Sequence, residues 1–143
     1  MSEVNIMERV RQFLRTYPPL SNGKLNVDFL PEDAKSYSVE AVPAQENIRS
    51  YVDGSSVRQC LFVVASREIF GEEVQQQLEN LDFYWKLSDW LKEKTRKKEL
   101  PDLGEGKQAL SIRATTSCYA FAANANSARY QIQCRLEFLQ RSE

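Results

Sequence analysis

Two short stretches of the chain combine lysine with glycine or serine, as some phosphate-binding loops and acyl-transfer enzymes do. Leu103–Lys107 reads LGEGK, but a P-loop has the form G-x-x-x-x-G-K-[ST], and here the glycines are too close together and Gln108 follows the lysine. Ser21–Lys24 reads SNGK, which has the serine–lysine spacing of some acyl enzymes without the further motifs that those enzymes require. Because Asn-Gly and Gly-rich segments favour turns, we predict a turn at each stretch.

The composition removes most familiar catalytic chemistry. The chain of 143 residues has no histidine, the commonest general base and metal ligand. Its three cysteines, Cys60, Cys118 and Cys134, show no C-x-x-C spacing, and two of them lie in apolar strand patterns. The carboxylates are scattered, so no acid/base pair stands out. We therefore predict a protein that is not an enzyme and that has no catalytic residue, cofactor or metal.

The charges are balanced. Nineteen basic and twenty acidic residues give a net charge of −1, so no overall field attracts nucleic acid or an anionic membrane. The one basic cluster, Lys92–Glu99, reads KEKTRKKE. Contact with nucleic acid phosphate is one interpretation, but cations are also favourable at a helix C-terminus, and we favour that account. The N-terminus lacks the apolar run of a signal peptide, and no stretch is long and apolar enough to span a membrane.

The first half of the chain predicts one helix and three strands. Residues 2–17 have the period of an amphipathic helix, and residues 25–29 and 37–41 alternate as short strands. Residues 43–56 have no sustained period and predict a long connection. Residues 57–70 are apolar at both alternating sets of positions, which is typical of a strand at the centre of a sheet.

The apolar residues between Glu72 and Lys97 follow two helical phases. One phase ends at Trp85, and the other continues through Leu87 and Leu91. This phase slip predicts two helices with a break near residues 80–82, where Asp82 is available as an N-cap. The aromatic residues of this segment are expected to pack the second helix onto the sheet, and they are Phe83, Tyr84, Trp85 and Trp90.

Three further strands are predicted after the helices. Residues 108–115 alternate, residues around Tyr119 and Phe121 form a short strand, and residues 128–140 form a long one after a turn. The last two strands are expected to form a hairpin. We predict a single α+β domain spanning residues 1–143, with a mixed or mainly antiparallel sheet and helices packed on one face.

In the last predicted strand, residues 128–140, apolar and polar residues alternate almost throughout. Ile132, Cys134 and Leu136 lie on the face expected to be buried, while Arg129 and Glu137 belong to the polar face. A solvated sheet face is the simpler interpretation. The alternative is a wall presented to a neighbouring subunit or to a lumen.

Four stretches of the chain, in this order, carry a resemblance to a known family. They are YVDGSSVRQCLFVVASREIFG (51–71), FYWKLSDWLKEK (83–94), LPDLGEGKQALSIRATT (100–116) and ARYQIQCRLEF (128–138). Together they resemble a family of small proteins from long-tailed bacteriophages and prophages, generally described as minor capsid or tail-terminator (tail-completion) proteins. The resemblance covers nearly the whole chain, and none of its motifs is catalytic.

The resemblance implies a structural role in the virion. Members of such a family are small α/β or α+β domains that assemble as a ring, typically a hexamer, which caps the tail tube and supplies the surface that joins tail to head. The implied partners are other copies of the chain, the tail tube protein and head–tail connector proteins, with DNA only passing through the lumen. The implied location is the host cytoplasm during assembly and then the virion. The residues expected to contact neighbours or to line the passage are Tyr51, Asp53, Ser55, Ser56, Arg58, Arg129, Gln131, Gln133, Arg135 and Glu137.

Other functions remain open from the sequence. A head–tail connector or minor capsid component would sit on the other side of the same joint. A monomeric adaptor could bind a protein partner through a sheet edge. A small metabolite enzyme is a further alternative, and it would need a concave, partly apolar pocket with convergent polar groups.

Overall fold

The computed structural model describes residues 3–18, 25–27, 37–69, 74–122 and 127–141. The predicted SNGK turn (21–24) and the end of the predicted strand 25–29 lie outside these residues. No described helix is both long and apolar enough to cross a membrane. The elements are α1 (Glu3–Leu14), β1 (Leu25–Val27), β2 (Tyr37–Val42), β3 (Asn47–Ser50), β4 (Ser56–Ile69), α3 (Val74–Lys97), β5 (Lys107–Ala114), β6 (Tyr119–Ala122) and β7 (Ser127–Gln140).

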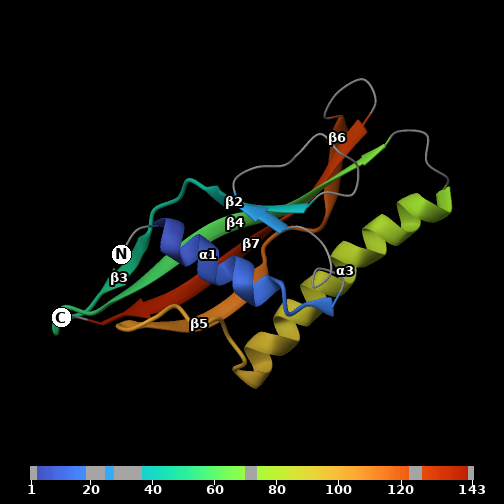
Figure 1. Cartoon of the computed structure of the whole chain (residues 1–143). Coiled ribbons are helices and arrows are strands. Elements are labelled where there is room, and N and C mark those ends of the chain that lie inside the picture. The colour runs from blue at the N-terminus through green and yellow to red at the C-terminus, as the bar shows by residue number, and fades with distance from the viewer. Residues whose placement is uncertain (1–2, 19–24, 28–36, 70–73, 123–126, 142–143) are drawn as a thin grey trace.

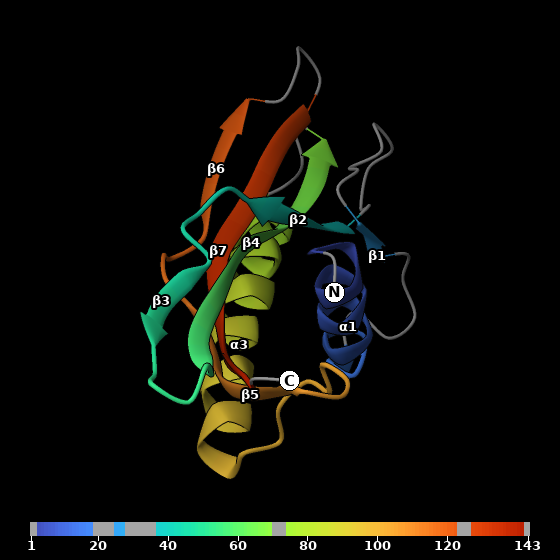
Figure 2. The ribbon, with the colours of Figure 1, turned by 90° about the vertical axis from the view of Figure 1, so that its left-hand side faces the viewer.

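The described strands form one sheet around two long central strands. The order is β1-β2-β4-β7-β5, with β3 also paired to β4 and β6 also paired to β7. β4 and β7 have 14 residues each and pair antiparallel in unbroken register from Ser56↔Gln140 to Ile69↔Ser127. The β1–β2 pairing is parallel and the other pairings are antiparallel. The helices α1 and α3 lie on the same side of these strands (Figures 1 and 2), which confirms the predicted α+β class, mixed sheet and covered face.

The core lies between this sheet and helices α1 and α3. The apolar face of β7 is buried, as its alternation predicts, and β4 is central, as predicted from its two apolar sets. The hydroxyl of Tyr17, just after α1, donates to the carbonyl of Phe83 on α3 at 3.1 Å and joins the helices. The fully buried side chains at the centre include Val10, Leu14, Phe62, Val64, Tyr84, Leu87, Leu91, Ile132, Cys134, Leu136 and Phe138.

The three cysteines are free thiols. Cys60 and Cys134 are buried in the core, where each acts as a small apolar residue, in keeping with the apolar strand patterns around them. Cys118 is partly buried beside the core. Burial raises the pKa of Cys134 to about 12 and that of Cys118 to about 11, so both thiols are protonated at neutral pH.

The helix of residues 74–97 is continuous, and the predicted break near residues 80–82 is wrong. Asp82 does not cap a second helix; its carboxylate instead pairs with Lys86 one turn later at 2.8 Å. The second apolar phase has another cause. Leu87 and Leu91 are buried against the sheet, whereas 44% of Leu81 and 71% of Trp85 are exposed. The slip in the pattern therefore marks two faces of one helix, one buried and one exposed.

The aromatic residues of α3 divide between these two faces. Tyr84 is buried, and Trp90 is partly buried with ring centroids 5.1 Å from Phe13 and 5.2 Å from Tyr17. Tyr84 packs the helix onto the sheet as predicted, whereas Trp90 packs it against α1 and Tyr17, and Trp85 is largely exposed.

The segment after α3 turns the chain back into the sheet. Lys94, Arg96 and Lys97 occupy the last turn of the helix, where the basic cluster was predicted to lie. Lys98 then has a φ of 59°, the left-handed conformation that commonly ends helices. The LGEGK stretch is a turn, as predicted, with positive φ at Gly104 and Gly106.

Thr95 attaches α3 to the edge of the sheet. Its hydroxyl donates to the carbonyl oxygen of Ile112 at 2.7 Å and accepts from the amide of the same residue at 3.0 Å. One side chain thus satisfies both backbone groups that Ile112 on β5 would otherwise present to another strand.

We expect Thr95→Val to lower the free energy of unfolding by about 1–3 kcal/mol, because both partly buried backbone groups of Ile112 lose their partner. Thr95→Ser keeps the hydroxyl and serves as the control. Urea unfolding followed by circular dichroism measures both variants. Equal stability of the valine and serine variants would show that the hydroxyl does not anchor the helix.

Candidate protein interaction surfaces

The polar residues of β7 lie on the face of the sheet that the helices do not cover. In the β4–β7 register Ile132 and Cys134 stand beside Val64 and Phe62 in the core, so their neighbours along the strand point the other way. Arg129, Gln131, Gln133, Arg135 and Glu137 therefore share one face, as predicted. We call it the open face.

Part of the open face is tied together by a polar network that crosses the sheet. The guanidinium of Arg129 on β7 donates to Glu40 Oε1 on β2 at 3.0 Å, and its Nε donates to Gln131 Oε1 at 2.8 Å. Ser38 Oγ donates to Glu40 Oε2 at 2.6 Å, and Gln131 Nε2 donates to the hydroxyl of Tyr119 on β6. The network thus links β2, β7 and β6 across β4.

The Glu40–Arg129 pair covers the apolar centre of β4. On β4, Glu40 is in register with Val63 and Arg129 is in register with Arg67. The ion pair of Glu40 and Arg129 therefore crosses β4 midway between these positions, at Ala65. Because β2 and β7 lie on either side of β4, about 10 Å apart, two long side chains can meet over this small residue. Ala65 is fully buried and only 6% of Val63 is exposed, although the described helices α1 and α3 lie on the other face of the sheet.

The environment of Glu40 favours its charged form. Burial by itself would raise the pKa of Glu40, but hydrogen bonds from Arg129 and Ser38 and the charge of Arg129 lower it below its usual value. Only 17% of the Arg129 side chain and 24% of the Glu40 side chain are exposed. Arg129 is therefore committed to a contact within its own chain, which the sequence does not reveal.

The other half of the open face carries an uncompensated positive charge. Arg135 on β7 stands directly opposite Arg113 on β5. Arg135 Nε lies 3.4 Å from Glu137 Oε1, but the two atoms are not aligned as a hydrogen bond, so the contact is electrostatic only. Among the described residues Arg113 forms no ion pair. Like charges directly opposite each other are unfavourable, so this site is suited to an acidic group from a partner.

The predicted long connection is instead a β-hairpin. Residues 47–50 form β3, which pairs with the start of β4. The amide of Gly54 donates to Tyr51 O at 3.1 Å, and the amide of Tyr51 donates to Ser55 O at 2.9 Å, with a φ of 92° at Gly54. This is a tight turn with glycine in the left-handed position. The prediction missed β3 because all four of its residues are exposed and give no alternation; Asp53-Gly54 was the available signal.

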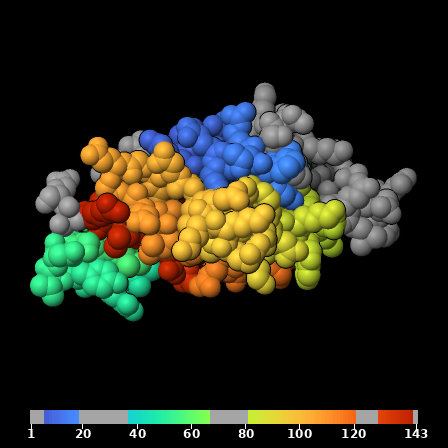
Figure 3. Space-filling model, turned by 90° about the horizontal axis from the view of Figure 1, so that it is seen from below, coloured from blue at the N-terminus to red at the C-terminus, as the bar shows by residue number. Residues whose placement is uncertain are grey.

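The hairpin presents apolar side chains to solvent. Tyr51 is 44% exposed, Ile48 is 46% exposed, and Val52 at the tip is fully exposed. Asp53 Oδ1 accepts hydrogen bonds from the hydroxyl and the amide of Ser55, at 2.6 and 2.9 Å, and these bonds lower the pKa of Asp53. The tip is thus held in one conformation. Figure 3 shows the hairpin projecting at one end of the molecule.

The ten predicted contact residues do not form one surface. Tyr51, Asp53 and Ser55 belong to the hairpin turn, at the end of the sheet. Ser56 and Arg58 are in register with Gln140 and Phe138, so they point to the same side as the core rather than to the open face. Arg58 stabilises the base of the hairpin through Ser56 Oγ at 3.0 Å and Glu46 Oε1 at 3.2 Å.

A groove lies beside the exposed face of α3. It encloses about 590 Å³ between the helix and the connection from β5 to β6. The exposed residues Leu81 and Trp85 lie on its helix side. We call it the α3 groove, and its lining residues are Leu81, Tyr84, Trp85, Ser88, Asp89, Lys92, Ala114, Thr115, Thr116, Ser117, Cys118 and Ile132. No sequence interpretation identified it, because Trp85 was expected in the core.

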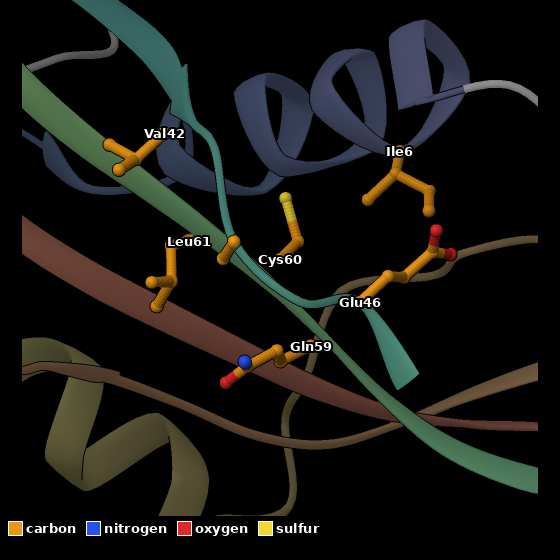
Figure 4. Close-up of a pocket in the computed structure, with 7 residues that line it drawn as sticks. Ile6, Val42, Glu46, Gln59, Cys60 and Leu61 are labelled. Atoms are coloured by element: carbon orange, nitrogen blue, oxygen red, sulfur yellow. The ribbon is translucent and has the colours of Figure 1, made fainter. Parts of the chain in front are cut away.

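A smaller pocket of about 180 Å³ opens where β2 has left β4 and β3 has not yet joined it. Figure 4 shows the thiol of Cys60 pointing toward α1 and Leu61 pointing to the opposite side of the strand. The polar groups around the pocket are used by the chain itself. Gln59 donates through its amide to Glu46 O and through Nε2 to Gln45 O, both at 2.8 Å. These contacts hold the connection against β4.

In comparisons with known proteins, no family model and no curated protein matches this chain. Within the described ranges, no three metal-ligating side chains lie close enough together to hold an ion.

The Glu40–Arg129 contact predicts a pH-dependent stability. Because the pKa of Glu40 is lowered in the folded chain, the stabilisation is present above the ordinary glutamate pKa and is lost as pH falls through the lower folded value. We expect Glu40→Gln to lower the free energy of unfolding by about 1–3 kcal/mol at neutral pH. The difference from the wild type should shrink in acid. Urea unfolding at several pH values measures it, and a difference independent of pH would contradict this account.

The Arg113–Arg135 juxtaposition predicts a stabilising substitution. We expect Arg113→Thr to raise the free energy of unfolding by about 0.2–1 kcal/mol, since it removes a like charge opposite Arg135 and threonine suits a strand. The gain should be larger at low salt. Lys107→Thr on the same strand, which stands opposite the neutral Gln140, is the matched control. A loss of stability on replacing Arg113 would contradict the interpretation.

Proposed function

We propose that this protein is a structural virion assembly protein that forms a ring of identical subunits, caps the tail tube of a long-tailed phage as a tail terminator, and provides the surface that joins tail to head. Two lines of argument support the proposal. The first is the ordered resemblance of four stretches over nearly the whole chain. The second is the arrangement of exposed surfaces on the fold.

The observation that carries the proposal is that large exposed apolar side chains are grouped at two places, while Leu110 on β5 and Tyr119 on β6 are exposed elsewhere. Ile48, Tyr51 and Val52 lie on the hairpin, and Leu81 and Trp85 lie on α3. Groups of exposed apolar residues usually mark contacts with other proteins. Two different contact patches on one chain suit a head-to-tail interface, and such an interface closes into a ring when the rotation between subunits allows it.

The two places are far apart along the sheet. Tyr84, the neighbour of Trp85, donates through its hydroxyl to Ser66 at 2.6 Å, near the far end of β4. The hairpin joins β4 at Ser56. Ten residues of strand separate these positions, or roughly 33 Å. A subunit could therefore hold one neighbour at each end.

The open face is a third surface and suits the other components of the joint. Its Glu40–Arg129 half is satisfied within the chain, while its Arg113–Arg135 half is suited to acidic groups. On the proposal this half meets the tail tube protein or a head–tail connector protein.

Native mass spectrometry over a wide range of concentration, with negative-stain images of any large species, tests the proposal. We expect a closed ring with a central hole, expected as a hexamer, that forms in a concentration-dependent way. Wild-type protein at high and low salt should be compared, because an interface with a large apolar part persists at high salt.

A monomer at every concentration would contradict a ring that forms in solution. It would favour the alternative of a monomeric adaptor, for which one feature is suited: β3 is a short, exposed edge strand that a peptide could extend. Binding of an extended peptide to the monomer would then be the decisive observation.

A further inference from the structure

We propose that the hairpin tip of one copy, residues 51–55, docks into the α3 groove of a second copy. The inference rests on the proposed function in that it names the contact by which the ring would close. It also stands on features that the ring proposal does not specify, namely the shape, rigidity and charge of the two surfaces.

The hairpin tip has the properties of a preorganised knob. Val52 is fully exposed and Tyr51 is 44% exposed, so binding would remove apolar area from water. The turn is fixed by the Gly54–Tyr51 and Tyr51–Ser55 backbone bonds and by the bonds from Ser55 to Asp53. A tip held in one conformation loses little entropy on binding.

The α3 groove has the properties of a matching socket. Its volume of about 590 Å³ lies within the roughly 300–1,000 Å³ of pockets that enclose a small ligand or a few side chains. Trp85 and Leu81 supply an exposed apolar wall, and exposed tryptophan is a frequent anchor of protein interfaces. The opposite wall is polar and comes from the connection between β5 and β6.

The tip with the end of β3 beside it, and the helix side of the groove, each carry one positive and one negative side chain. The hairpin carries Arg49 and Asp53, and the helix side of the groove carries Asp89 and Lys92. In the part of the chain that the structure describes, none of these four residues forms an ion pair. Docking in one orientation would set each hairpin charge against a groove charge of opposite sign, which gives the contact a defined register.

The tip and the groove of one chain cannot meet. About 33 Å of paired strand separates the levels of Ser56 and Ser66, and the continuous β4–β7 ladder holds that distance. The contact is therefore between copies, and each copy uses its tip once and its groove once. The hairpin tip is small, so a single contact is expected to be weak and ring closure to strengthen it.

Two variants that each break one side of the contact provide the test. Val52→Asp places a charge at the tip, and Trp85→Glu places one on the groove wall. Both positions are exposed, so urea unfolding should show folding close to that of the wild type. We expect each variant alone to associate roughly 30-fold or more weakly than the wild type. The controls Val52→Ile and Trp85→Phe should still assemble.

Mixing the two variants is the decisive step. The Trp85→Glu protein keeps an intact tip and the Val52→Asp protein keeps an intact groove, so together they should form a one-to-one heterodimer that does not grow. Native mass spectrometry with one variant isotopically labelled identifies it. If the groove instead binds a small ligand or an unrelated protein, the two variants should not form this dimer.

The possible outcomes separate this inference from the ring. If the wild type forms rings and both charged variants form the same rings, the docking is overturned and the ring proposal stands. The wild type could instead form open chains or dimers. If each variant alone abolishes them and the mixture partly restores them, the docking is supported and the ring is contradicted. Failure of the mixed variants to pair at about 1 mM, where a single weak contact is populated, would overturn the docking, and so would a wild type that stays monomeric at that concentration.

Discussion

The pairing of β4 with β7 is the constraint on which the rest of the structure depends. These two strands are joined along their whole length, and each of the other strands of the described sheet apart from β1 pairs directly with one of them. A slip of one residue would either turn Phe62 and Val64 away from the helices or bring Gln131 and Gln133 into the core. The core, the hairpin and the open face are therefore specified by a single register.

The polar face of β7 has two roles that its sequence pattern does not distinguish. The Arg129 half is used within the chain, where its pair with Glu40 lies over Ala65 and shields the apolar centre of β4. The Arg135 half has an arginine directly opposite and an imperfect contact with Glu137. The like charges of Arg113 and Arg135 oppose folding of an isolated subunit, and on the proposed function this half of the face meets a partner. A face that the sequence pattern shows as uniformly polar is thus divided into a part with an ion pair across the sheet and a part with two like charges side by side.

Much of the fold follows from local pattern, and the errors have a physical cause. The alternation of residues 128–140 and the doubly apolar run of residues 57–70 predict the two central strands, because burial imposes a period on side chains. The same reasoning fails where apolar residues are exposed: Leu81 and Trp85 imitate a helix break, and the exposed strand β3 leaves no alternation at all. The Glu40–Arg129 pair joins residues 89 positions apart, so it depends on the register of three strands and is not visible in the sequence.

On the proposed contact, the β4–β7 ladder also determines the shape of the assembly. The hairpin extends one end of this ladder, and α3 is fixed near the other end through Tyr84 and Ser66. The right-handed twist of the strands therefore sets the rotation from tip to groove, and hence from one copy to the next. If repeated rotation brings the last copy back to the first, the assembly is a closed ring. If it does not, the assembly is a helical filament. A long ladder without a register shift resists bending, so it defines this rotation better than a flexible linker could. The same rigidity that orders the core would then decide the number of subunits.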